Sequence, residues 1–204
     1  MTEVNRKLRA RQTRARIATT AARLFAERGY QGTPMDVIAA EASVAVQTVY
    51  FAFRTKPELL IAAYDQAVFG SLEAPHPDRQ EWYLNSLAEQ DATKALRHFV
   101  DATMGILLRS GPLHPVMVSN PDQEIRRAFR DRQDGRYEAY RRFVQALMQH
   151  GNINPGLDQP TATDRLYALL SPELYSILCT ERGWTPDQFR IWVVATLEDQ
   201  LLRD

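Results

Sequence analysis

The chain has 204 residues, 45% of them hydrophobic, with 25 basic and 25 acidic side chains. This length allows one small module and one larger domain with its own core, and the composition is that of an ordinary globular protein. The net charge of the whole chain is zero, so it gives no support for nucleic-acid binding. The sequence contains no run of 18 apolar residues, so no membrane span is predicted.

The charge is nevertheless unevenly distributed along the chain. Residues 1–60 carry ten Lys and Arg against five Asp and Glu, a net +5, whereas residues 61–204 carry 15 against 20, a net −5. Six of the cations fall within residues 6–16, before the first apolar stripe. Such a basic arm, including Arg11 and Arg14, can run along phosphates or enter a minor groove. The alternative is a solvated basic tail without a partner.

Residues 33–56, TPMDVIAAEASVAVQTVYFAFRTK, predict two short helices joined by a tight turn. Thr33 is the expected N-cap, followed by Pro34 at the first helical position, and the turn is expected at residues 43–45. In the second helix Val49 and Phe53, four residues apart, are predicted to point inward.

The opposite face of that second helix is expected to carry Gln47, Thr48 and Phe51, with Tyr50 on its flank. Two short helices joined in this way, the second outwardly polar and aromatic, fit a duplex major groove. Two packed surface helices without a ligand are the alternative, and the neighbouring positive charge favours DNA.

This region resembles the DNA-binding domain of the TetR (AcrR-type) family of transcriptional regulators, over roughly residues 13–66. Residues 17–30 are similar to the family's first helix and its exit. The other motif positions are held here by Thr33, Ala42, Ser43, Val44, Ala45, Thr48, Val49, Tyr50, Phe53, Thr55 and Lys56. The resemblance and the face of the second helix together select candidate DNA-binding residues: Thr33, Ala45, Gln47, Thr48, Tyr50, Phe51, Lys56, Arg11 and Arg14.

Three residues depart from the usual pattern of the family. Ser43 replaces the customary turn glycine, so its position must tolerate a side chain. Ala45 replaces a serine that would cap the recognition helix. Gln47 replaces a small residue and adds a side chain able to read an adenine edge.

Residues 57–204 predict one helix after another, separated by a Pro-rich break at 74–80, a Gly-Pro stop at 111–112 and a loop at 152–160. No period-2 strand is evident, so the fold class is all-α, with an N-terminal three-helix helix-turn-helix domain (1–56) and a C-terminal helical ligand-binding and dimerisation domain (57–204). The expected inner faces are Leu60, Ala63, Tyr64, Ala67 and Val68; Leu96, Phe99, Val100, Thr103, Met104, Leu107 and Leu108; and Ile125, Phe129, Tyr137, Tyr140, Val144 and Leu147.

A ligand pocket is predicted in the second domain, because hydroxyl, imidazole and amide groups mingle there with apolar and aromatic side chains. Ordinary core residues with satisfied hydroxyls are the alternative for any one of them, and the resemblance favours the pocket. The candidate residues are Tyr64, Trp82, His98, Phe99, Thr103, Met104, Leu107, Met117, Asn120, Phe129, Tyr137 and Tyr140.

The last forty-five residues predict a helical hairpin. One stretch covers 163–182 with a kink or break at Pro172, where Ser171 caps the second piece, and Gly183 ends it before Thr185 starts another helix. A second copy could complete a four-helix bundle, as the family resemblance implies; the alternative is a hairpin that packs only on its own domain. The candidate dimer-interface residues are Leu170, Leu174, Ile177, Leu178, Phe189, Trp192, Val193, Thr196, Leu197 and Leu201.

The chain shows no phosphate-cradling glycine loop, no metal-type pairing of His or Cys and no isolated carboxylate pair, so neither catalysis, a metal nor a cofactor is expected. The single Cys179 and the lack of a signal-like apolar stretch fit a cytoplasmic protein. The predicted function is a homodimeric transcriptional regulator, a repressor released from its double-stranded DNA operator by a small hydrophobic or aromatic inducer. The alternatives are a ligand-independent DNA-binding or architectural protein and, less favoured, an all-α enzyme.

Overall fold

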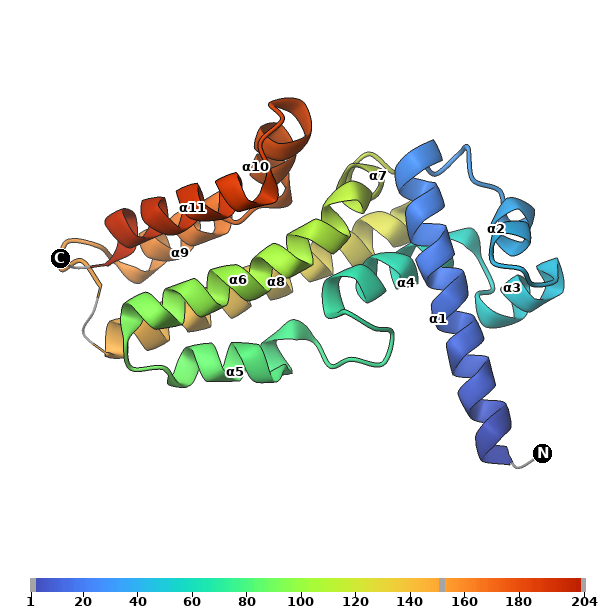
Figure 1. The fold of residues 1–204 in the computed structure, drawn as a ribbon, viewed down its shortest axis with the longest axis horizontal. Helices are drawn as coiled ribbons and strands as arrows, with labels where there is room; N and C mark the ends of the chain where they lie inside the picture. Colours follow the sequence, from blue (N-terminus) through green and yellow to red (C-terminus); the bar gives the residue numbers. More distant parts are fainter. Residues whose placement is uncertain (1–2, 151–152, 203–204) are drawn as a thin grey trace. The chain divides into compact units, whose positions relative to one another are not determined.

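The computed structural model describes residues 3–150 and 153–202, which form helices joined by short connections (Figure 1). No strand occurs in these described ranges, where one isolated β-bridge joins Ile153 to Leu202. The all-α class predicted from the sequence is confirmed.

The chain divides into two compact units. Unit 1 comprises Met1–Ala74 and Pro112–Arg130, and unit 2 comprises Pro75–Gly111 and Asp131–Asp204. The functional boundary expected between residues 56 and 57 stays a prediction, because these units are defined by packing alone.

Unit 1 contains α1 (Glu3–Arg28), α2 (Met35–Glu41), α3 (Val46–Ala52), α4 (Lys56–Phe69), α7 (His114–Val118) and the first turns of α8 (Gln123–Gln149). The basic residues 6–16 continue α1 without a break, so the predicted arm is helical. Apolar side chains recur along α1 at Ile17, Ala21, Leu24 and Phe25, which makes one buried stripe. Residues of α2, α3, α4, α7 and α8 complete this core.

The pair α2 and α3 forms the predicted helix-turn-helix. No single described helix is long and apolar enough to cross a membrane; α2 and α3 together pass that test of length and composition, but they are bent by 107°. Ile38 of α2 and Val49 of α3 are fully buried in the core of unit 1.

Unit 2 contains η1 (Pro77–Arg79), α5 (Glu81–Ala88), α6 (Ala92–Ser110), the rest of α8, α9 (Gln159–Leu169), α10 (Pro172–Tyr175), η3 (Ser176–Glu181, a π-helical segment) and α11 (Pro186–Leu201); the short η2 (Gly111–Leu113) follows α6. Four of these helices begin where a side-chain oxygen accepts a backbone N–H: Asp91 caps α6, Asp158 caps α9, Ser171 caps α10 and Thr185 caps α11.

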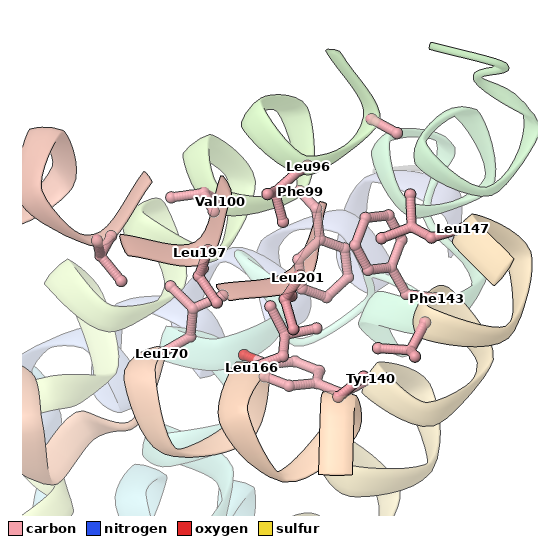
Figure 2. Packing of buried hydrophobic residues seen from close by; sticks show 14 of the residues in the cluster. Leu96, Phe99, Val100, Tyr140, Phe143, Leu147, Leu166, Leu170, Leu197 and Leu201 are labelled. Atoms are coloured by element: carbon pink, nitrogen blue, oxygen red, sulfur yellow. The ribbon is translucent and has the colours of Figure 1, made fainter. Parts of the chain in front are cut away.

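The core of unit 2 is centred on aromatic rings. Figure 2 shows Phe99 of α6 beside Phe143 of α8, and their ring centroids are 4.1 Å apart in a stacked arrangement. Tyr140 meets Phe99 edge-on at 5.1 Å. Leucines of α9 and α11, among them Leu166 and Leu197, close the cluster.

Two expected inner positions of α6 are wrong. The buried stripe follows residues 92, 95, 96, 99, 100, 103, 104 and 107, and the exposed His98 lies outside that helical spacing. Leu108 continues the spacing, four residues after Met104, and is nevertheless 47% exposed near the end of the helix. Conversely, sequence analysis missed the fully buried Phe143, which lies four residues before the predicted Leu147 on the same face.

The break predicted at Pro172 and the restart at Thr185 are confirmed. Ser171 Oγ accepts the backbone N–H of Leu174 at 3.1 Å, Gly183 has a positive φ of 75°, and Thr185 forms a capping box with Gln188. Three residues of α11 that were predicted to lie in the dimer interface are instead packed within their own unit. Phe189, Val193 and Leu197 are fully buried against unit 2's own core.

Candidate nucleic-acid interface

One face of helix α3 is exposed to solvent, and the opposite face is packed against the core of unit 1. Its Val49 and the following Phe53 are fully buried, whereas Gln47 and Tyr50 are exposed and Phe51 is 91% exposed. Phe51 is the most exposed large apolar side chain in the described residues. Phe51 therefore contributes little to the packing of unit 1, and the exposed parts of the Tyr50 and Phe51 rings are available to a partner.

The turn before α3 places a non-glycine residue in a backbone conformation that glycine adopts more easily. Ser43 adopts φ 53°, the left-handed region in which glycine is the preferred residue. Val44 donates its backbone N–H to Ala39 O at 3.0 Å and is half-buried against the core. The position usually held by glycine thus keeps its left-handed backbone although it carries a side chain.

Thr33 does not fulfil its predicted role. Helix α2 begins at Met35 with Pro34 as N-cap, and no side chain caps it. The Thr33 hydroxyl is fully buried and lies 2.8 Å from Gly29 O and 3.2 Å from Leu24 O. It therefore donates to the carbonyl end of α1 and is not available to a phosphate.

Lys56 lies at the first position of α4, immediately after the N-cap Thr55, whose hydroxyl oxygen accepts the N–H of Glu58 at 3.1 Å. Its Nζ is 4.3 Å from the ring centroid of Tyr30, and burial lowers the pKa of Lys56. Burial together with the nearby carboxylates of Asp122 and Glu124 raises the pKa of Tyr30 to about 12. The ring of Tyr30 thus fixes the lysine beside the start of α4.

The two arginines predicted to bind DNA have partners inside unit 1. The Arg14 guanidinium carbon lies 4.0 Å from the Phe53 ring centroid, and the side chain donates to Ala52 O at the end of α3. Arg14 also lies 3.6 Å from a carboxylate oxygen of Glu58. Its role is to hold α3 against α1. Arg11 forms an exposed ion pair with Glu73 at 3.2 Å, an interaction that a phosphate could replace at little cost.

The helix-turn-helix geometry agrees with a comparison of sequence families. Residues 17–63, which run from the buried stripe of α1 into α4, match the family model of bacterial regulatory proteins, tetR family. The matched segment contains α2 and α3, so this part of the chain resembles a bacterial regulatory protein of the tetR family. No curated protein sequence matches the chain.

Solved structures of similar fold cover almost the whole chain. NalD, the secondary repressor of the MexAB-OprM multidrug efflux pump in Pseudomonas aeruginosa, has a TM-score of 0.70 and 21% identity, covering 96% of this chain and 99% of NalD. A putative transcriptional regulator from Saccharomonospora viridis in complex with choline has a TM-score of 0.68 and 22% identity, covering 95% and 99%. The regulator FadR from Bacillus subtilis in complex with stearoyl-CoA has a TM-score of 0.70 and 18% identity, covering 89% and 96%. At these identities the likeness shows the fold.

The predicted pocket residues fall into two groups. Trp82, His98, Phe99, Thr103, Met104, Leu107, Tyr137 and Tyr140 belong to unit 2, and Tyr64, Met117, Asn120 and Phe129 belong to unit 1. Within unit 2, the exposed His98 is not an inner residue. Tyr137 is also wrongly placed, because it faces α9 at the surface and donates to Asp164 at 2.9 Å.

The unit 1 members have mixed roles. Tyr64 and Phe129 meet edge-on at 6.1 Å. The buried Asn120 uses its amide oxygen to accept the backbone N–H of Asp122 at 3.1 Å, which shapes the connection into α8. The amide oxygen of Asn120 therefore already has a partner within the protein.

The predicted dimer residues divide by burial. Leu170 and Leu201 are fully buried, as are the α11 residues described above. Leu174, Leu178, Trp192 and Thr196 are half-buried, and Ile177 is exposed. Sequence analysis missed Ile191, which is 65% exposed on the outer face of α11. Its position two residues from the buried Val193 identifies it as an outward residue only once the inward face is known.

Proposed function

We propose that this TetR-family regulator binds its operator as a homodimer and is a repressor whose DNA affinity is lowered by a small hydrophobic or aromatic molecule. The observation that carries the proposal is the exposed face of α3, with Gln47, Tyr50 and Phe51 outward on a helix whose other side is fully packed. As a bacterial transcription factor it would act in the cytoplasm.

The residues divide their work at the DNA. Gln47 and Thr48 reach base edges, and Phe51 contacts a thymine methyl group. Tyr50 and Lys56 contact phosphates on the flanks, where they set the register of the helix without reading sequence. Arg11 and other exposed cations of α1 add salt-dependent affinity.

The ligand-controlled part is supported by the proteins of similar fold. The structures of the regulators from S. viridis and B. subtilis are complexes with choline and stearoyl-CoA. SmeT, another protein of similar fold with a TM-score of 0.67 and 17% identity, is in complex with triclosan. NalD is described as a repressor. A ligand acts on such a regulator only through its different affinity for the DNA-bound and free states, and a typical coupling is about 1–3 kcal/mol.

The dimer is supported by the outer face of unit 2 and by half-site geometry. Ile177 and Ile191 remain exposed on η3 and α11, and Ala195 lies one turn beyond Ile191. A single recognition helix buries too little surface for strong operator binding, whereas a symmetric dimer reads two half-sites. The interface therefore uses this outer face and leaves the buried stripe of α11 in place.

The test is a DNA-binding titration at several salt concentrations, using duplexes selected with the full-length protein. Lys56→Ala is expected to weaken binding to all sequences and to reduce the salt slope by about one unit. Lys94→Ala, an exposed lysine of unit 2 that pairs with Asp91, is the matched control and should change neither. If Lys56→Ala instead altered sequence preference at unchanged affinity, the division of labour would be wrong.

Ligand control is tested by repeating the titration against a library of metabolites and drugs. Release of the operator by at least one compound supports an inducible repressor. A failure of every compound to change either the operator affinity or the melting temperature would favour the alternative of a ligand-independent DNA-binding protein.

A further inference from the structure

Unit 1 contains a hollow that the DNA-binding function does not use. Its volume is about 820 Å³, within the usual range for small-molecule sites. The hollow lies between the end of α7 and the first turns of α8. It is lined by Met117, Val118, Gln123, Glu124, Arg126, Arg127, Phe129 and Arg130.

Three arginines give the hollow its charge. Gln123, Arg126, Arg127 and Arg130 follow the spacing i, i+3, i+4, i+7, so they share one face of α8. Across the described ranges, none of the three guanidinium groups has an ion pair or hydrogen bond. Like charges at this spacing destabilise a helix, so folding does not account for them.

Arginines later in α8 form ion pairs, unlike those of its first turns. Arg141 pairs with Glu138 at 2.8 Å, and Arg142 pairs with Asp78. Arg136 lies over the Tyr167 ring at 4.0 Å, so among the described arginines of α8 only those of its first turns lack an ion pair, a hydrogen bond and a ring contact.

The floor of the hollow is apolar. Met117 is fully buried, Val118 is 53% exposed, and Phe129 is half-buried beside the rings of Tyr64 and His114, with centroids 6.1 and 5.3 Å away. The hollow thus offers apolar side chains to the body of a ligand and guanidinium groups to a negative charge, a combination that suits an amphipathic anion.

The start of α8 itself does not hold an anion. Asp122 Oδ1 accepts the backbone N–H groups of Glu124 at 2.8 Å and Ile125 at 3.2 Å, so these amides are already satisfied. Glu124 is the one acid in the lining, against three arginines. An anion in the hollow would therefore be bound by guanidinium groups, which form charge-assisted hydrogen bonds to carboxylate and phosphate.

We propose that this hollow binds a small molecule with an apolar body and one anionic group, a carboxylate or a phosphate monoester. DNA phosphate is a poorer fit, because Figure 1 shows α1 between α7 and the reader helices α2 and α3 within unit 1. The inference rests on the proposed function and specifies the chemical class of the inducer.

The position of the hollow links its occupant to the DNA reader. Met117 and Ile125 belong to the same buried cluster as Ile17 and Leu24 of α1 and Val49 of α3. The carboxylates of Asp122 and Glu124 act on Tyr30, whose ring contacts Lys56. A bound anion thus changes the packing and the electrostatic field within the unit that carries α3.

The experiment is calorimetric titration of the full-length protein with matched twelve-carbon probes. Dodecanoate or dodecyl phosphate is expected to bind, and the two anions distinguish a carboxylate site from a phosphate site. Dodecanol and dodecyltrimethylammonium test the need for negative charge, and inorganic phosphate tests the need for an apolar body; all three are expected to bind at least about tenfold more weakly.

Substitutions in the lining are expected to change the affinity for the anion in opposite directions. The double variant Arg126→Ala/Arg130→Ala should weaken anion binding by about tenfold or more, since charge-assisted hydrogen bonds are lost. Val118→Asp should also weaken it, whereas Glu124→Gln should strengthen it. Arg182→Ala, an exposed arginine of unit 2, is the control and should leave binding unchanged.

The outcomes separate this inference from the proposed function. Anion binding that is insensitive to the arginine variants, or equal binding of the neutral and cationic probes, would overturn the inference. Operator release by an unrelated compound would then still support the inducible repressor. Arginine-dependent binding without any effect on operator affinity would support the site and contradict its role as the inducer site.

Discussion

Helices α3 and α11 both carry apolar and aromatic residues at helical spacing, yet the structure uses them in opposite ways. Helix α3 points its aromatic residues outward, and Phe51 is 91% exposed. Helix α11 points Phe189, Val193 and Leu197 into the core of unit 2, where they are fully buried. An apolar stripe therefore indicates a partner only when the rest of the chain leaves it exposed.

The difference arises from what each helix has beside it. Helix α11 packs against α6 and α9, so its stripe is buried within its own unit. Helix α3 is short, and the buried Val49, together with Phe53 just after the helix, attaches it to the core of unit 1. Its remaining surface faces solvent and is free to read a ligand as large as a DNA duplex.

The largest expected effect comes from charge on the inward face of α11. Val193→Asp should lower the free energy of unfolding by about 3–5 kcal/mol, because it leaves an unpaired charge in a closed core. Ile191→Asp, two residues away on the outer face, is the matched control and should change it by about 0.5 kcal/mol or less. Urea denaturation measures both. Equal effects would mean that α11 is not oriented as described.

Ile191→Asp also separates folding from assembly. Because Ile191 lies on the proposed dimer face, this variant should sediment as a folded monomer. A stable dimer would show that the interface lies elsewhere.

The second largest effect is expected on operator binding, without a change in the stability of the protein. Phe51→Ala should weaken operator binding by about 1.5–3 kcal/mol if the ring becomes buried against DNA. Gln47→Ala should lose about 1–3 kcal/mol and relax the preference at particular base pairs. Melting temperatures should stay unchanged, since neither side chain packs in unit 1. A loss of stability without loss of binding would contradict the reader face.

A smaller effect is expected at Thr33. Thr33→Val should cost about 1 kcal/mol of unfolding free energy, because the hydroxyl no longer donates to the carbonyl end of α1. Thr161→Val, at an exposed threonine, is the control. If Thr33→Val kept its stability and lost DNA affinity, the hydroxyl would contact phosphate after all.

The smallest effect is expected in the turn before α3. Ser43→Gly should raise the stability of the protein by about 0.5–1 kcal/mol, because glycine adopts φ 53° without steric cost. Ser43→Val should lower it, since a branched side chain fits that backbone poorly. Thermal unfolding at neutral pH compares the three proteins.

Local patterns in the sequence predicted most of the fold. The restart at Thr185, the break at Pro172 and the inward pair Val49 and Phe53 are confirmed, because caps, proline and four-residue spacing act within a few residues. Thr33 shows the limit of such patterns. It has the right identity for an N-cap, but the carbonyl end of α1 takes its hydroxyl.

By itself, the sequence determined the helical class and the helix-turn-helix motif, and it indicated the resemblance to the TetR family, because these depend on short-range spacing and on a motif of adjacent residues. Only the tertiary structure decided which apolar stripes are buried, that Arg14 holds α3 in place, and that three arginines of α8, which have no acidic partner among the described residues, line one hollow. Those properties depend on residues brought together from distant parts of the chain, and no local spacing records which neighbours a side chain will meet.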